Sequence, residues 1–215
     1  MDAESQENHL KAYGITYWVL SKQQKVQWLL NYRGGSFMMP DGEAIRKECQ
    51  IRGVSFEVLS DGQAEQILDE ISSPSQNQDA VILEKAPKIA VYSPKENQPW
   101  DDAVTMVLTY AEIPYVTVYD EEVLGDKLAL YDWLHLHHED FTGQYGRFYG
   151  AYRAAPWYIE GKEQAEALAQ RLGYAKVSDE KLAVAQKIRN YVNTPAEGIE
   201  PPCHPVSLLP YVSSE

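Results

Sequence analysis

The residues best suited to chemistry gather in one segment, LHLHHEDFTGQYG, which begins at Leu134. If this segment is a strand, side chains alternate between its faces, so His135 and His137 share one face and His138 lies on the other. A His-x-His pair with carboxylates nearby suits zinc or another transition metal. The same imidazoles could act as general acid and base near neutral pH. The candidate ligand-binding residues of this segment are His135, His137, His138, Glu139 and Asp140.

A structural interpretation of these histidines stays open beside the functional one. Histidines inside a strand commonly hydrogen-bond buried backbone or tyrosine groups. The spacing identifies no third metal ligand, so zinc bound by His135 and His137 is one alternative only. The functional interpretation rests on position, because open α/β sheets bind ligands at the carboxyl ends of their strands.

A second candidate is the polar loop that follows the apolar run KIAVYS. It contains Ser93, Trp100 and Asp101 and joins a strand to a helix N-terminus, where anionic ligands bind readily. Helix capping explains Asp101 without any ligand. The turn at Gly34-Gly35 also offers Arg33 to a carboxylate or phosphate.

The elements that would position both segments follow one another from residue 88 onward. KIAVYS and YVTVY are typical of buried strands, DDAVTMVLTYAEI has a helical period, and EEVLGD is a short acidic helix or turn. YDWLHLHH then supplies a third strand. This order predicts right-handed βαβ units, and hence an α/β fold with a three-layer, open, mainly parallel sheet.

The N-terminal part alternates helices and short apolar runs. A helix near residues 5–22 would bury Leu10, Tyr13, Tyr17 and Leu20 on one face. VQWLLNY fits a strand or a short helix, and VSFEVLS alternates like a strand. Two further helices are expected at 41–52, closed by Gly53, and at 61–71, capped by Asp61.

Two more helices complete the pattern before a proline-rich tail. KEQAEALAQRL, stopped by Gly173, has strong helix formers, and DEKLAVAQKIRNYV would turn Leu182, Val184, Ala185 and Ile188 inward. We therefore expect an N-terminal α/β portion (1–86), a second α/β portion that shares or abuts its sheet (87–193) and a disordered tail (194–215).

Composition excludes several partners. The chain has 215 residues, of which 44% are hydrophobic, and its 19 basic and 32 acidic side chains give a net charge of −13. Such a field repels nucleic acid and anionic lipid. No apolar run approaches a membrane span, and the polar start lacks a signal peptide, so the sequence as written predicts a cytoplasmic protein. Cys49 is expected as a buried hydrophobe.

Several strings together resemble a known family: HLKAYGITYWVL, VQWLLNYRGGSFM, APKIAVYSP, QPWDDAVTMVLTYAEIPY and YDWLHLHHEDFTGQYG. They look like a bacterial family often labelled asparagine synthetase B, over about residues 9–192. The resemblance implies a class I glutamine amidotransferase-like, or flavodoxin-like, α/β fold. It also implies export of the full-length form to the periplasm or cell envelope.

The chain departs from that label at the residues that would carry its chemistry. A true synthetase has a cysteine nucleophile after the initiator methionine, where this chain has Asp2, and a Ser-Gly-Gly-x-Asp-Ser loop, which is absent. The family continues into a strand and a Cys-containing turn, whereas this sequence diverges after about Tyr191. Neither Cys49 nor Cys203 matches the nucleophile position. The resemblance therefore implies a truncated or frame-shifted fragment.

Three functions follow as hypotheses. The first is an amidotransferase-like protein, catalytically incomplete, whose ligand crevice lies at the histidine-rich strand end and takes a small polar ligand. The second is a non-catalytic module for a small molecule or carbohydrate. The third is a metal-dependent hydrolase that uses the histidine cluster.

Overall fold

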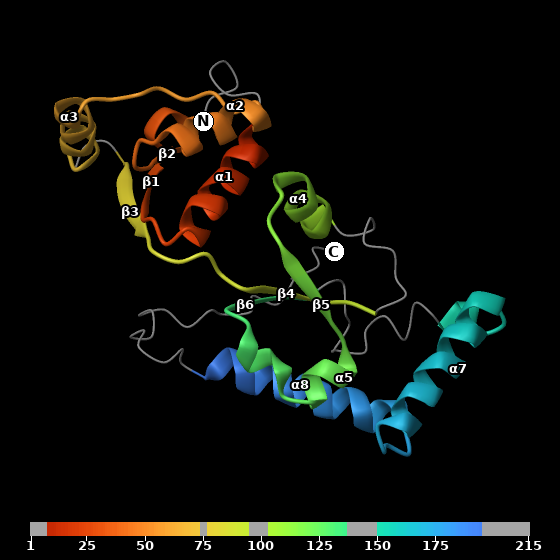
Figure 1. Cartoon of the computed structure of the whole chain (residues 1–215). Coiled ribbons are helices and arrows are strands. Elements are labelled where there is room, and N and C mark those ends of the chain that lie inside the picture. Colours follow the sequence, from red (N-terminus) through yellow and green to blue (C-terminus); the bar gives the residue numbers. More distant parts are fainter. Residues whose placement is uncertain (1–7, 74–76, 95–102, 137–149, 195–215) are drawn as a thin grey trace, which may run out of the picture. The chain divides into compact units, whose positions relative to one another are not determined.

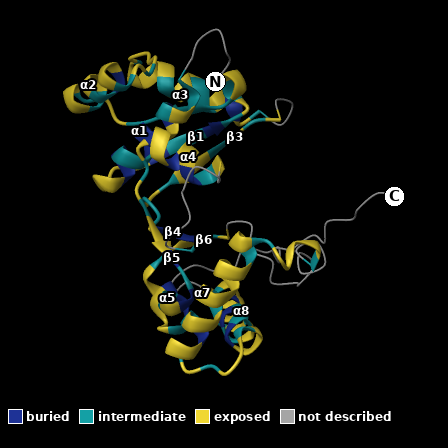
Figure 2. Cartoon of the chain, turned by 90° about the vertical axis from the view of Figure 1, so that its right-hand side faces the viewer, coloured by how far each residue is buried: buried dark blue, intermediate teal, exposed yellow. Residues whose placement is uncertain are grey.

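The computed structural model describes residues 8–73, 77–94, 103–136 and 150–194. By their contacts the residues divide into two compact units. The sheet unit comprises Met1–Tyr119 and Leu130–Glu139, and the helical unit comprises Asp120–Ala129 and Asp140–Glu215. Each unit has buried residues of its own (Figure 2). The boundaries expected after residues 86 and 193 stay predictions.

The sheet unit contains an antiparallel sheet built around β1 (Val26–Leu30). β1 pairs with β2 (Ser36–Met38) on one side and with β3 (Asp79–Leu83) on the other, both antiparallel. The run VQWLLNY is thus a strand rather than a short helix. A 3-10 turn, η1 (Tyr32–Gly34), connects β1 to β2.

α1 (His9–Ser21) packs against β1 of this sheet, and α2 (Glu43–Arg52) packs against α1 (Figure 1). The core between them contains Ile15, Val19 and Val26, together with the buried Cys49 predicted from sequence. The predicted inner face of α1 is confirmed for the buried Leu20 but is wrong for Leu10 and Tyr13, which are 38% and 41% exposed. Besides Leu20, the helix turns Ala12, Gly14, Ile15, Thr16 and Val19 inward.

Local capping interactions fix where α2 ends and where α3 (Asp61–Ile71) begins. Gly53 closes α2 at φ 66°, in the left-handed region that favours glycine, as expected. Ser60, rather than Asp61, caps α3 through a capping box with Gln63. Residues 54–60 form no strand, although their apolar alternation predicted one, because no neighbouring strand pairs with them among the described residues.

A second, parallel sheet follows in the same unit. β4 (Ile89–Tyr92) lies between β5 (Tyr115–Val118) and β6 (Trp133–Leu136), and both pairings are parallel. All four residues of β4 are buried, as a central parallel strand requires. The expected βαβ order is confirmed, but the parallel sheet is small. The strands described form two separate three-stranded sheets, one of them antiparallel.

The βα crossover contains α4 (Ala103–Ala111), which packs on one face of β4. Leu108 of α4 shares a buried cluster with Ile89 and Val91, which point to the same side of the strand. α4 also packs against α1. That approach is close at Gly14, where a Cβ atom would stand 1.8 Å from the Ala111 carbonyl oxygen.

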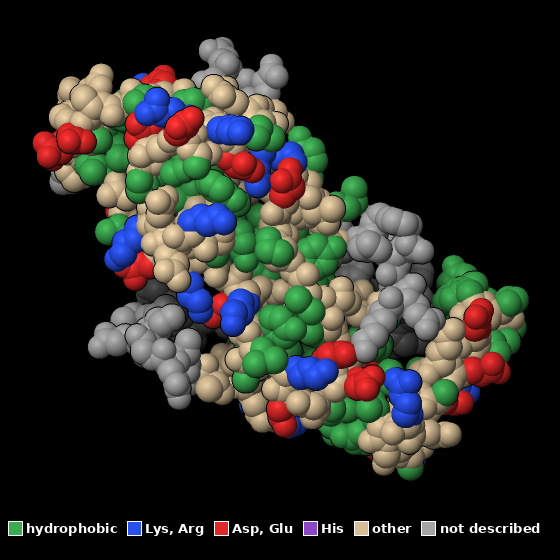
Figure 3. Space-filling view, in the orientation of Figure 1, with side chains coloured by type: hydrophobic (Ala, Val, Ile, Leu, Met, Phe, Trp, Pro, Cys, Tyr) green, Lys and Arg blue, Asp and Glu red, His purple; other side chains and the backbone are tan. Residues whose placement is uncertain are grey.

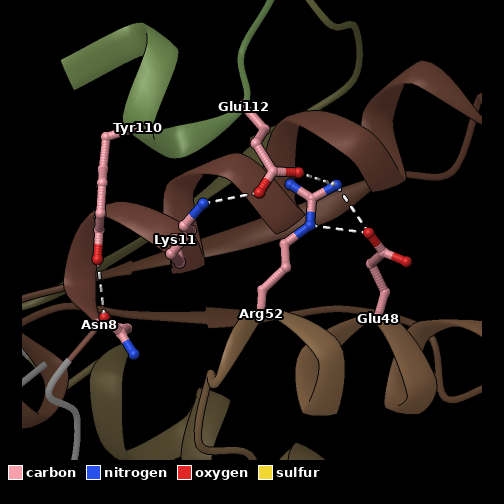
Figure 4. Close-up of polar contacts among 6 residues, drawn as sticks. All are labelled: Asn8, Lys11, Glu48, Arg52, Tyr110 and Glu112. Atoms are coloured by element: carbon pink, nitrogen blue, oxygen red, sulfur yellow. Dashed lines mark hydrogen bonds and ion pairs between the residues drawn. The ribbon is translucent and has the colours of Figure 1, made fainter. Parts of the chain in front are cut away.

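Polar side chains border the contact of α1 with α4 and α2 (Figure 4). Glu112 accepts from the Lys11 ammonium at 2.7 Å and pairs with the Arg52 guanidinium at 3.4 Å, and these contacts hold the pKa of its carboxyl below the usual range. The remaining contacts link Arg52 to Glu48 and Tyr110 to Asn8. The network joins three helices of the sheet unit.

The helical unit is built from α5 (Asp120–Leu124), α7 (Pro156–Arg171) and α8 (Val177–Asn193). Short 3-10 turns, η3 (Lys127–Leu130) and η4 (Gly150–Tyr152), lie between them in sequence. Val184 and Ile188 of α8 are buried as expected, whereas Leu182 is 71% exposed. No helix in the described part of the chain is long and apolar enough to cross a membrane.

Candidate functional site

The parallel sheet reverses its strand order at β4. The chain passes from β4 through α4 to β5 on one side, and β6 is then added on the other side of β4. The carboxyl ends of β4 and β6 are therefore neighbours, with Tyr92 paired to Leu136. Open α/β sheets bind their ligands in the crevice outside such a point, because the connections leave it to opposite sides. This strand edge is the candidate site.

Ser93 lies at the edge, directly after β4. Its backbone N–H donates to the Val118 carbonyl at 3.0 Å, which extends the pairing of β4 with β5 by one bond. Its hydroxyl lies 3.5 Å from the Pro94 carbonyl, at the limit of a hydrogen bond. Beneath it, the fully buried Tyr92 ring packs against Tyr119 with 5.2 Å between centroids. The backbone at Ser93 is thus firmly held.

His135 lies within β6, opposite Val91 in the parallel register. Paired residues of a sheet point to the same face, so the imidazole lies on the side of the sheet that packs against Leu108 of α4. It is partly buried. His135 therefore stands on a sheet face one residue before the end of the strand, whereas Ser93 stands at the edge itself.

The other predicted site residues lie outside the described part of the chain. They are His137, His138, Glu139, Asp140, Trp100 and Asp101. In sequence, the histidine-rich segment directly follows β6, and the loop of Trp100 follows Ser93 after β4. Each of these segments therefore follows one of the two strands, β4 and β6, whose carboxyl ends are neighbours.

The expected metal site at His135 was sought among the residues that the structure describes. Among these residues no group of three or more His, Cys, Asp or Glu side chains could hold an ion. Arg33, which the Gly34-Gly35 turn was expected to present to a carboxylate or phosphate, donates to the carboxylate of Glu57 within the chain.

Sequence reasoning missed a buried carboxylate pair in the helical unit. Asp120 begins α5 and Glu180 lies in the first turn of α8, with exposed fractions of 0% and 1%. Lys181 donates to Asp120 at 2.9 Å. Burial, followed by the charge of Asp120, raises the pKa of Glu180 to about 7, although Lys181 opposes the shift.

The pair is a place where a proton is held near neutral pH. Burial and the neighbouring charge of Asp120 both disfavour the ionised form of Glu180, and a side-chain hydrogen bond to Asp120 adds to the shift. The helical period could have indicated that Glu180 faces inward, because it stands four residues before Val184 and eight before Ile188, and both are buried. Only apolar residues were nevertheless predicted for the inner face of this helix.

The parallel sheet and its edge define the class of structure, a mixed α/β protein with a small parallel sheet. Comparisons of the chain with family models, characterised proteins and solved structures gave no match.

Proposed function

We propose that the parallel sheet is part of a flavodoxin-like, class I glutamine amidotransferase-like fold that binds a small polar ligand without transferring an amide group. The strand order carries this proposal. β5-β4-β6 corresponds to the order 2-1-3 that opens the flavodoxin-like sheet, in which the ligand lies at the junction of the first and third strands. Here that junction is formed by β4 and β6.

The residues that follow β4 and β6 in the chain favour a polar ligand. Ser93 follows β4, and the segment after β6 contains His137, His138, Glu139 and Asp140. Hydroxyl, imidazole and carboxylate groups together supply both donors and acceptors. The resemblance to the family labelled asparagine synthetase B points in the same direction, because a glutamine-like amide is a small polar molecule of this kind.

Cys49 is unsuited to act as the nucleophile of amide transfer. A thiol acts as a nucleophile through its thiolate, which forms in exposed, electropositive surroundings. Cys49 lies in the core beside Ile15 and Val26 with 5% of its surface exposed, and burial raises the pKa of its thiol. It is therefore a packing residue. Among the described residues, no other nucleophilic side chain stands beside a base in a sequence motif of amide transfer.

Calorimetric titration with L-glutamine tests the proposal. The double variant His137→Ala, His138→Ala should weaken binding at least tenfold, because it removes the two polar groups that directly follow β6 in sequence. The matched control is His9→Ala, the same substitution in α1, which should bind as the wild type does. Released ammonia is measured in parallel, with none expected above the protein-free blank.

Each outcome decides one part of the proposal. Equal affinity in the wild type and the double variant would place the ligand elsewhere, and no binding at all would reject an amide ligand. Ammonia release would contradict the absence of catalysis. Stoichiometric zinc that is lost from His135→Ala, His137→Ala would favour the metal-dependent hydrolase instead.

A further inference from the structure

The helical unit contains a groove of about 620 Å³ between α7 and the start of α8. The two helices pack against each other, and the segment that joins them also contributes to the wall. Cavities of roughly 300–1,000 Å³ accommodate small molecules. The space is therefore of ligand size, and the side chains around it determine which molecule would fit.

The floor of the groove is a row of small residues along α7. Gly161, Ala165 and Ala169 stand four residues apart, so they share one face of the helix, and Trp157 begins the same row. The row passes from the exposed Gly161 to Ala169, which is 1% exposed. Because a helix rises about 1.5 Å per residue, the row is roughly 18 Å long from 157 to 169. Such a trough suits an elongated apolar body.

Trp157 provides an aromatic wall at the exposed end of the row. Its ring packs edge-on against Tyr158, with 6.0 Å between centroids, and lies 5.7 Å from the ring of Tyr152. The residue is nevertheless 54% exposed. Hydrophobic side chains lie beside charged ones on the surface that α7 forms (Figure 3). A tryptophan held by its neighbours and half open to solvent offers a large apolar contact to a ligand in the groove.

The charges along the groove leave one ammonium group unpaired. On the α7 side, Lys162 pairs with Glu166 at 3.5 Å, and Gln170 follows without a charge. Across the groove, Lys176 lines the wall directly before α8, and no described side chain binds its ammonium group. Asp179, three residues later, lies outside the wall. The groove thus has one positive charge in excess, which an anionic group of a ligand would complement.

The charge of the whole chain acts in the opposite direction. A net charge of −13 repels anions at long range. At physiological ionic strength, however, exposed charges more than roughly 8 Å apart are largely screened. A carboxylate in the groove therefore responds chiefly to Lys176. Because this side chain is exposed, its contribution is small, and most of the affinity must come from the apolar body.

We propose that this groove binds an amphipathic monocarboxylate, whose elongated apolar body lies along Gly161, Ala165 and Ala169 while its carboxylate accepts from the Lys176 ammonium group. The site is independent of the crevice proposed at β4 and β6. Its ligand class differs as well, because apolar contact supplies most of the binding here, whereas polar groups supply it in the crevice.

Three related probes separate the parts of this proposal. Decanoate has both features, hexanoate has the same carboxylate on a shorter chain, and decyltrimethylammonium has the same chain with the opposite charge. Calorimetric titration of the full chain at pH 7, below the concentrations at which the probes form micelles, should give the tightest binding for decanoate. Hexanoate should bind roughly tenfold more weakly or worse, since each fully buried methylene is worth about fourfold in affinity. Decyltrimethylammonium should bind roughly two- to fivefold more weakly than decanoate, the range of an exposed ion pair.

Two variants, each with a matched control, locate the binding. Ala165→Trp fills the trough and should abolish saturable decanoate binding, whereas Ala167→Trp, at an exposed position of α7 outside the groove, should leave it unchanged. Lys176→Gln should remove the preference for decanoate over decyltrimethylammonium. Lys127→Gln, an exposed lysine of η3 outside the groove, should preserve that preference. Lys176→Gln changes only an exposed side chain, so it keeps the test decisive if Ala165→Trp fails to fold.

Equal affinity for hexanoate and decanoate would refute the apolar groove. Equal or tighter binding of decyltrimethylammonium would refute the carboxylate. Unchanged decanoate affinity in Ala165→Trp would refute the location. A ligand-free wild type that sediments as a dimer, beside an Ala165→Trp variant that sediments as a monomer, would show that a second copy of the chain occupies the groove instead. None of these results depends on glutamine binding, so the groove and the crevice can fail separately.

Discussion

Replacing Glu180 with glutamine tests the buried carboxylate pair most directly. Glu180 is 1% exposed and hydrogen-bonds to Asp120, which is fully buried. Glutamine keeps nearly the same shape and can still donate to Asp120, but it has no charge at any pH. The substitution therefore removes the titration and leaves the packing of α5 against α8 in place.

The direction of the effect follows from the raised pKa. Glu180 has an ordinary pKa of 4.5 and a folded-state pKa of about 7. Between these values the folded chain keeps a proton that the unfolded chain has lost, so the free energy of unfolding falls as pH rises. The contribution is complete below pH 4.5 and lost above pH 7. Its size is about 3 kcal/mol, since one pKa unit corresponds to about 1.4 kcal/mol.

Urea unfolding between pH 4.5 and 8, followed by the loss of helical circular dichroism, measures this change. The wild type should lose about 3 kcal/mol over the interval relative to Glu180→Gln. Taking the difference between the two proteins cancels the pH-dependent contributions of the other carboxyl groups. One of these is Glu112, whose lowered pKa makes the free energy of unfolding rise with pH, at lower pH than the effect of Glu180. Glu163→Gln, an exposed glutamate of α7, is the matched control.

Parallel pH profiles for the wild type and Glu180→Gln would refute the reasoning, because they would mean that Glu180 ionises as freely in the folded chain as in the unfolded one. A wild type that gains stability as pH rises through the interval would refute it as well. The control should follow the wild type throughout.

Three further predictions concern the sheet unit. Gly14→Ala should lower the free energy of unfolding by about 3 kcal/mol in urea titrations, because its Cβ would meet the Ala111 carbonyl oxygen; an unchanged midpoint would contradict the close approach. Ser60→Ala should lose about 1 kcal/mol through the capping box, whereas Ser60→Asp should retain most of it. In protein whose other cysteine is alanine, Cys49 should react with a thiol reagent only as fast as the chain unfolds, and rapid native-state labelling would show an exposed thiol.

Sequence reasoning succeeded where the signal was local. The period of α4, the glycine that ends α2 and the β-branched run of β4 each depend on near neighbours, and all three elements are present. The parallel order followed from the alternation of strands and helices. Short strands were harder, because β3 begins at the charged Asp79 and is stabilised by its distant pairing with β1.

Burial was predicted less well than element type. α1 turns Gly14 inward because α4 packs there, which no helical period reveals. Glu180 was missed for a related reason. A buried carboxyl depends on its partner Asp120, 60 residues away in sequence, rather than on local hydrophobicity.

The contact between α1 and α4 also affects the chain during its synthesis. α1 ends at Ser21, but its partner α4 ends at Ala111, about 90 residues later. At 5–20 residues per second, roughly 5 to 20 seconds pass before that face of α1 is covered. During this interval Gly14 and its neighbours are open to chaperones and to other nascent chains. The antiparallel sheet is complete in sequence by Leu83, so it can form while α1 still awaits its second partner.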